Sequence, residues 1–75
     1  MGYAKGARRY ALVDRDNTEG DYEYSSLREA QRAGRKYDQA VILRAYVKED
    51  GEWRYDDSEL VWTPDGGNVW PPRKP

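Results

Sequence analysis

The amino-acid sequence predicts an α+β fold: a four- to five-stranded, mainly antiparallel sheet with one helix packed on one face, in the order strand–strand–helix–strand–strand. Three observations predict it. Segments of alternating apolar and polar residues occur in both halves of the chain, a helix-start motif stands at Ser26–Glu29, and Asp50-Gly51 separates two alternating segments. The 75 residues suit one domain at 8–70, a flexible N-terminus at 1–7 and an extended, proline-rich tail at 71–75.

The first half of the chain predicts a strand pair. Residues 9–14 read as a strand, and residues 15–20 carry the Asp, Asn, Thr and Gly that are typical of turns. Residues 21–24 alternate with period two, which places Tyr22 and Tyr24 on the same face of a short second strand.

A helix is expected over residues 27–37. Ser26 and Glu29 form a capping box, in which the Ser26 hydroxyl accepts a hydrogen bond from the Glu29 amide. A narrow apolar stripe runs from Leu27 through Ala30 to Tyr37. We expect Gly34 to allow a close approach to the sheet, where a larger side chain would not fit.

Residues 39–48 and 52–56 predict a hairpin with two competing registers. A two-residue Asp50-Gly51 turn sets Glu49 opposite Glu52, a like-charge pair. A three-residue turn with a Gly51 bulge pairs Lys48 with Glu52 and Arg44 with Asp56, and it puts Trp53 beside Val47 and Tyr55 beside Ala45. Opposed charges and matched apolar faces both favour this second register. A further strand at 59–63, a turn at 63–66 and a short return strand at 68–70 complete the sheet.

The composition argues against an enzyme. The sequence has no Cys and no His, which removes disulfides, thiolates and the commonest general base and metal ligand. The acidic residues stand in polar, turn-rich stretches, where the burial that separates carboxyl pKa values is not expected. We therefore predict no catalytic residue, no cofactor and no metal. Without an apolar run of about 20 residues or a signal-peptide core, we expect no membrane partner and a cytoplasmic location.

One segment invites a calcium hypothesis. Asp14, Asp16 and Thr18 provide oxygen ligands at alternate positions. An EF-hand loop needs Gly sixth and Glu twelfth, but Glu19 and Ser25 occupy those places. An acidic hairpin turn is the preferred interpretation.

Charge is balanced overall but clustered along the chain. With 13 basic and 14 acidic residues the net charge is −1, yet residues 14–23 and 49–59 are strongly acidic. Such asymmetry bears on association rather than on fold. We predict a non-enzymatic binding protein, an inhibitor that engages a protein or nucleoprotein complex through an acidic and aromatic surface. The predicted contact residues are Asp14, Asp16, Glu19, Asp21, Arg44, Tyr46, Glu49, Asp50, Glu52, Arg54 and Asp56.

Two alternatives stay open. The first is a nucleic-acid-binding module that uses the basic helix face, although a pI near 5.4 is low for such a protein and a charged solvent face is a simpler explanation. Its residues are Arg28, Arg32, Arg35 and Lys36. The second is an oligomerising assembly subunit, such as a homodimer, in which Trp62 and Trp70 form the interface rather than capping the core.

A resemblance points toward one class of inhibitor. The segments Tyr10–Asp14, Tyr24–Ala30 and Val41–Trp53 resemble short bacterial and phage proteins with the order hairpin, helix, hairpin, over about residues 8–56. In size, absence of Cys and charge clustering the chain also resembles phage-encoded inhibitors of bacterial defence, anti-CRISPR proteins among them. That resemblance implies stoichiometric binding to a defence complex inside a bacterial or phage-infected cell. These inhibitors share no motif, so it assigns no residue.

Overall fold

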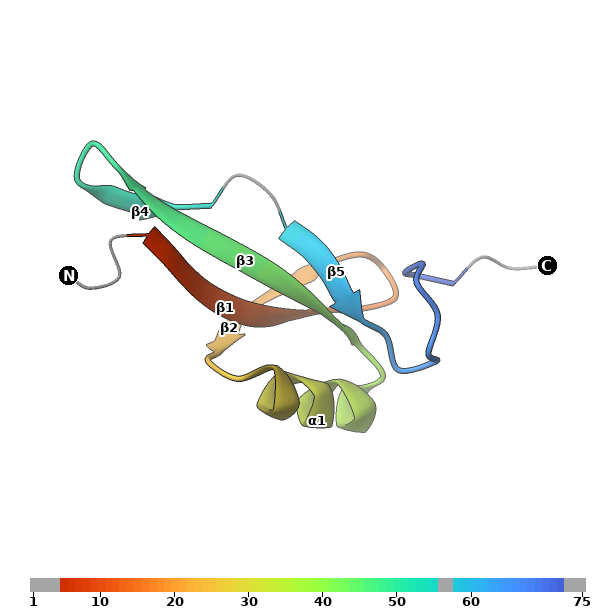
Figure 1. The fold of residues 1–75 in the computed structure, drawn as a ribbon. Coiled ribbons are helices and arrows are strands. Elements are labelled where there is room, and N and C mark those ends of the chain that lie inside the picture. The colour runs from red at the N-terminus through yellow and green to blue at the C-terminus, as the bar shows by residue number, and fades with distance from the viewer. Residues whose placement is uncertain (1–4, 56–57, 73–75) are drawn as a thin grey trace.

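A computed structural model describes residues 5–55 and 58–72, which form one helix and five strands (Figure 1). The elements are β1 (Lys5–Val13), β2 (Glu19–Tyr24), α1 (Leu27–Tyr37), β3 (Ala40–Glu49), β4 (Glu52–Arg54) and β5 (Ser58–Trp62). All strand pairs are antiparallel, in the order β2-β1-β3, with β4 and β5 pairing successive parts of the free side of β3. The predicted α+β class is confirmed, and β5 corresponds to the further strand expected at residues 59–63.

Some element boundaries differ from the sequence-based expectation. Strand β1 begins at Lys5 rather than near residue 9, and β2 begins at Glu19 rather than at Asp21. Long pairing with β3 explains the first difference, since Lys5 lies opposite Val47 and Val13 opposite Ala40. The ends of the predicted flexible N-terminus and proline-rich tail, residues 1–4 and 73–75, lie outside the described residues.

Helix α1 spans the predicted residues because both of its ends are capped. The Ser26 hydroxyl accepts a hydrogen bond from the Glu29 amide at 3.3 Å. At the other end Asp38 adopts a left-handed conformation with φ of 58°, and its backbone N–H bonds to the Gly34 carbonyl. Arg15 forms an ion pair with Asp38 at 2.6 Å, which ties this end to the turn after β1. Within the described ranges, no helix has the length and apolar character needed to cross a membrane.

The sheet has an apolar layer on each face. On the helix side Leu12, Ala30 and Val41 are buried, with Trp62 and several partly buried side chains packed around them. Gly34 permits this packing, since a Cβ there would lie 2.6 Å from both the Gln39 carbonyl oxygen and Trp62 Cζ3. The expected close approach of helix and sheet is therefore confirmed.

The opposite face carries the second layer, formed by Ala11, Val13, Ala40 and Ile42 with Leu60 and Trp70 packed on it. The Trp70 indole N–H lies 3.0 Å from the Val13 carbonyl oxygen and 2.9 Å from that of Asp14. Residues 68–70 form bends, so the predicted return strand is wrong. The turn at 63–66 is present, with a hydrogen bond from the Gly66 amide to the Thr63 carbonyl at 3.2 Å.

The hairpin adopts the register that the sequence-based reasoning rejected. Glu49 lies opposite Glu52, Lys48 opposite Trp53 and Val47 opposite Arg54. Asp50 and Gly51 have φ of 52° and 83°, and a two-residue turn with both values positive matches the twist of the flanking strands. Turn geometry therefore outweighs the like-charge pair, which is exposed and weak in water. The predicted Arg44–Asp56 pair involves a residue outside the described part of the chain.

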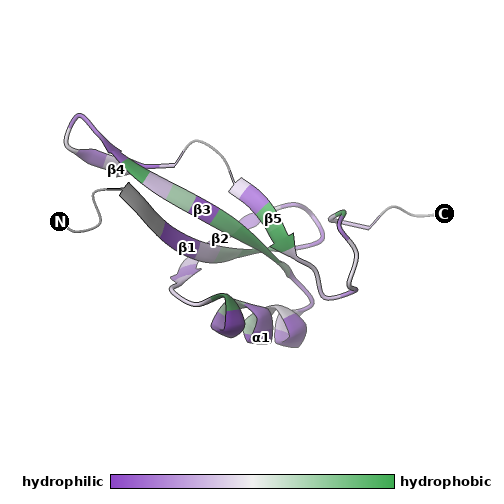
Figure 2. Ribbon diagram, in the orientation of Figure 1, coloured by the Kyte–Doolittle hydropathy of each residue, from purple (hydrophilic) through white to green (hydrophobic). Residues whose placement is uncertain are grey.

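Hydropathy divides the molecule into two regions. Figure 2 shows the hydrophobic colour concentrated where β3 runs beside β5, whereas the β3–β4 tip is mainly hydrophilic. The helix packs on the first region only, and the hairpin extends away from it (Figure 1). We call the second region, residues 44–55, the hairpin arm.

Candidate partner-binding site

The register of the hairpin arm decides which side chains share its face away from the helix. A one-residue change of register moves every side chain of β4 to the opposite face. In the observed register Trp53 lies directly opposite Lys48, whose ammonium is 5.8 Å from the centroid of the indole ring. Tyr46 stands two residues from Lys48 on the same face, and its ring meets Tyr55 edge-on at 5.1 Å. Tyr46, Lys48, Trp53 and Tyr55 are the aromatic face of the arm.

Arg44 lies at the base of this face and is buried. The sequence-based prediction made it an exposed contact residue, and this is wrong, because only 7% of its side chain is exposed. Its guanidinium donates hydrogen bonds to Glu23 at 2.8 Å and to Glu19 at 2.9 Å. The Tyr55 ring lies 5.1 Å from its central carbon. A charge in the middle of a packed strand requires such partners, since an unpaired buried charge is costly.

Glu23 is the hub of the network. Besides Arg44, it accepts a hydrogen bond from the Tyr46 hydroxyl at 2.5 Å, and Arg9 lies 3.8 Å from its other oxygen. Burial opposes its ionisation, but the bonds from Tyr46 and Arg44 outweigh burial and hold the pKa of the Glu23 carboxyl below its usual range. Burial, together with the bond to Glu23, raises the pKa of Tyr46 to about 12, so its hydroxyl keeps its proton at physiological pH.

Sequence reasoning missed Glu23 and Tyr55 as members of the site. A usable signal was present: Glu23 alternates with Tyr22 and Tyr24, so it lies on the opposite face of β2. Arg44 stands between apolar and aromatic residues on a central strand. A cation buried there needs an acidic partner from another strand. The pairing of both β2 and β3 with β1, which joins these groups, is a tertiary property.

The two acidic segments do not form one surface. The turn after β1 and the turn after β3 lie at opposite ends of the paired strands, as Figure 1 shows. In the first turn, Asp14 accepts hydrogen bonds from the backbone amides of Asp16 and Thr18, so it stabilises its own loop. That geometry agrees with the acidic-turn interpretation, and no group of three or more acids in the described ranges could hold a metal ion.

The remaining predicted contact residues are divided between these two ends. Glu19 pairs with Arg44, whereas Asp16 and Asp21 are exposed. Glu49, Asp50 and Glu52 form the acidic tip of the hairpin arm, where Arg54 pairs with Glu49 at 3.1 Å. Asp56 falls outside the described residues.

The two tryptophans predicted at an oligomer interface both pack within the monomer. Trp62 contacts the helix-side core and Trp70 the opposite layer. Each is partly buried, so each has the core-capping role that was the competing interpretation. Oligomerisation through these residues stays a prediction.

The basic helix residues do not act as one patch. Arg35 turns toward the sheet, with its guanidinium carbon 5.3 Å from the Trp62 ring centroid. Arg28, Arg32 and Lys36 are exposed and follow one another at intervals of four residues, which aligns them along the helix. Of the four basic residues predicted to act together, three are aligned along the helix. The fourth, Arg35, contacts the core.

Comparison with known proteins does not place the chain in a family. Searches of protein-family models, curated protein sequences and solved structures find no significant match to the chain.

Proposed function

We propose that this chain is a non-enzymatic binding protein and that it engages a protein partner through the hairpin arm. The observation that supports this most directly is the aromatic face, which combines Tyr46, Trp53 and Tyr55 with a cation and borders the acidic tip. Tyr, Trp and Arg are the residues most enriched at energetic centres of protein interfaces.

Preorganisation strengthens the proposal. Tyr46 is held by Glu23, and Tyr55 rests on the Arg44 guanidinium, so both rings have fixed neighbours before any partner arrives. Ordering side chains on binding costs about 0.5–1.5 kcal/mol for each immobilised group, and a preformed surface avoids that cost. The arm also extends beyond the helix (Figure 1), which leaves room for a partner.

The acidic tip adds a preference for basic partners. Glu49, Asp50 and Glu52 carry three carboxylates within four positions, against two nearby cations, Lys48 and Arg54. Complementary potentials raise association rates and exclude wrong partners more than they raise affinity. A protein with a basic groove is therefore the partner class that fits.

The finer form of this proposal is an inhibitor of a bacterial defence complex such as CRISPR–Cas. Its support is the resemblance in size, charge clustering and absence of Cys. A plasmid-interference assay tests it directly, because co-expression of the chain should restore transformation of a targeted plasmid. Unchanged interference across the defence types tried would reject the inhibitor proposal. It would leave the broader binding proposal intact.

The binding proposal is tested with three variants and one captured partner. Affinity capture from a bacterial lysate identifies the partner, and titration with the purified partner then compares wild type, Trp53→Ala and the triple variant Glu49→Gln/Asp50→Asn/Glu52→Gln. We expect Trp53→Ala to weaken binding about tenfold or more, and the triple variant to weaken it mainly at low salt.

The control is the double variant Asp16→Asn/Asp21→Asn, which removes carboxylates at the opposite end of the strands. It should bind like wild type. Equal affinity of all variants, with folding verified by circular dichroism, would overturn the proposal.

A further inference from the structure

We propose that the chain has a second, independent binding site, a groove between α1 and β2 that binds single-stranded nucleic acid. In this site tyrosine rings stack on bases while a row of helix cations contacts phosphates. The site lies on the helix side of the sheet, away from the aromatic face of the arm. It goes beyond the proposed function and does not depend on it.

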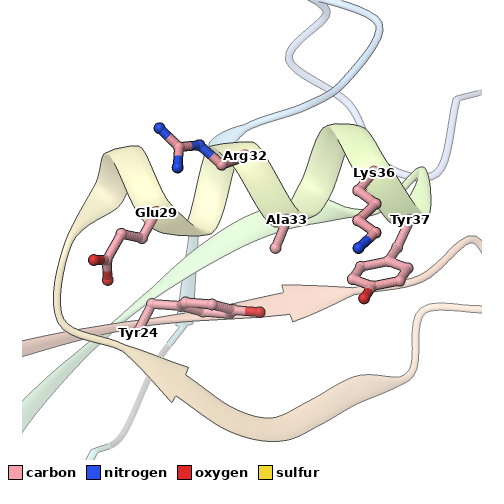
Figure 3. Close-up of a pocket in the computed structure, with 6 residues that line it drawn as sticks. All are labelled: Tyr24, Glu29, Arg32, Ala33, Lys36 and Tyr37. Atoms are coloured by element: carbon pink, nitrogen blue, oxygen red, sulfur yellow. The ribbon is translucent and has the colours of Figure 1, made fainter.

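The groove is a cavity of about 310 Å³ with aromatic walls. Figure 3 shows Tyr24 from β2 and Tyr37 from the end of α1 on either side of a space below Ala33. The small Ala33 side chain leaves that space open. Tyr37 is 56% exposed, so a flat ligand can reach its ring.

A third ring extends the aromatic row. Tyr22 is 71% exposed and meets Tyr24 edge-on, with ring centroids 4.7 Å apart. Burial, together with the neighbouring Tyr22, Tyr37 and Glu29, raises the pKa of Tyr24. Stacking on exposed aromatic rings is tolerant of sequence, because every base has a π face.

Cations line the same groove. Arg32 and Lys36 belong to its lining, and Arg28 continues their row one turn earlier, about 6 Å along the helix axis. The Lys36 ammonium lies 5.4 Å from the Tyr37 ring centroid, which places a positive charge beside a stacking surface.

Acids are few on this side of β2. Glu29 is the one carboxylate in the groove lining, against two cations. Glu23 belongs to the opposite face of the strand, where Arg44 holds it. The groove is thus a positively charged, aromatic site in a chain with a net charge of −1. Unstacked bases fit it, whereas a duplex keeps its bases out of reach of the rings.

The test measures binding of a fluorescent, single-stranded oligonucleotide of about ten nucleotides by anisotropy, within the site sizes of small single-strand-binding domains. We expect Tyr37→Ala to weaken binding about fivefold or more, and Arg32→Glu/Lys36→Glu about tenfold or more. The slope of log K against log salt should be near −2, from three phosphates at about −0.7 each.

The matched control is Lys48→Glu/Arg54→Glu, which makes the same charge change on the hairpin arm and should leave oligonucleotide binding within about twofold, because its sites are remote from the groove. Equal binding of a duplex, equal competition by polyphosphate, or loss in the control as large as in Arg32→Glu/Lys36→Glu would each overturn the groove proposal. So would an absence of binding.

A measurement on the wild-type chain tests the groove without relying on variants that must fold correctly. Addition of the oligonucleotide should shift the amide NMR signals of Tyr22, Tyr24, Arg32 and Tyr37 and leave those of the hairpin tip unchanged. Shifts confined to the hairpin arm would overturn the groove proposal. Either result leaves the hairpin proposal to its own protein-binding test.

Discussion

The two halves of β3 belong to different kinds of structure, although they form one continuous strand. In the first half, Val41 is completely buried on the helix side of the sheet, and β1 and β5 flank its strand. In the second half Val47 is 38% exposed and no helix covers it. Arg44 marks the boundary, where apolar packing gives way to an ionic and aromatic network.

The difference shows that strand length alone does not define the core. A core needs a second layer, and α1 and Trp70 supply layers only to the first half of β3. Beyond that point, the strand gains stability from hydrogen-bonded pairing and polar contacts. A surface of that kind is free to contact another molecule.

The largest expected effect comes from replacing one arginine in each region. Arg44→Met should lower the free energy of unfolding by about 3 kcal/mol, because it leaves Glu23 without its buried partner. Arg54→Met should change it by about 0.5 kcal/mol or less, because the Arg54–Glu49 pair is exposed on both sides. Urea denaturation measures both values. Similar losses would show that the network is not buried in the way described.

A matched valine pair tests the packing itself. Val41→Ala should cost about 2 kcal/mol, since it removes two methyl groups' worth of burial and leaves a cavity. Val47→Ala should cost about 0.5 kcal/mol or less. If thermal melting gave the two variants the same loss, the division of β3 into a core half and an arm half would fail.

Gly34→Ala sharpens the helix side of the comparison. Ala favours a helix by up to about 1 kcal/mol over Gly, but the added Cβ would lie 2.6 Å from a backbone oxygen and from Trp62. We expect a net loss of about 1–2 kcal/mol in thermal unfolding, because the packed layers must separate. Arg28→Ala, at an exposed helix position, serves as the control and should be nearly neutral. A stabilised Gly34→Ala variant would contradict the close approach.

The smallest expected effect concerns pH. The Glu23 carboxyl has a folded pKa below its ordinary value of 4.5, so its contribution to stability is complete above that pH and is lost as pH falls through the folded pKa. Glu23→Gln should therefore flatten the decline of stability below about pH 4.5. Asp21→Asn, at an exposed site, should leave the decline unchanged in acid titrations followed by circular dichroism. Identical profiles of stability against pH for wild type and Glu23→Gln would show that the Glu23 carboxylate does not stabilise the fold through this network.

Local chemistry was enough to predict the helix and the strand pairs. The Ser26 cap and the period-two alternation of Tyr22 and Tyr24 act over a few residues, and the structure contains both. The need for glycine at position 34 was also predicted, although it depends on the distant Trp62 ring as well as on the nearby Gln39 carbonyl. The hairpin register was predicted wrongly because charge pairing and matched apolar faces were weighted above turn geometry. The Asp50-Gly51 backbone accepts two positive φ values, and that preference fixed the pairing.

The sequence by itself determined the fold class, the approximate positions of the helix and the five strands, and the absence of thiol and imidazole side chains. Only the tertiary structure decided that Arg44 is buried rather than exposed, that the two acidic turns lie apart, and that Tyr24 and Tyr37 meet across a groove. The physical reason is that burial and proximity depend on which strands pair and which layer covers them. These are contacts between residues distant in sequence, and no local pattern records them.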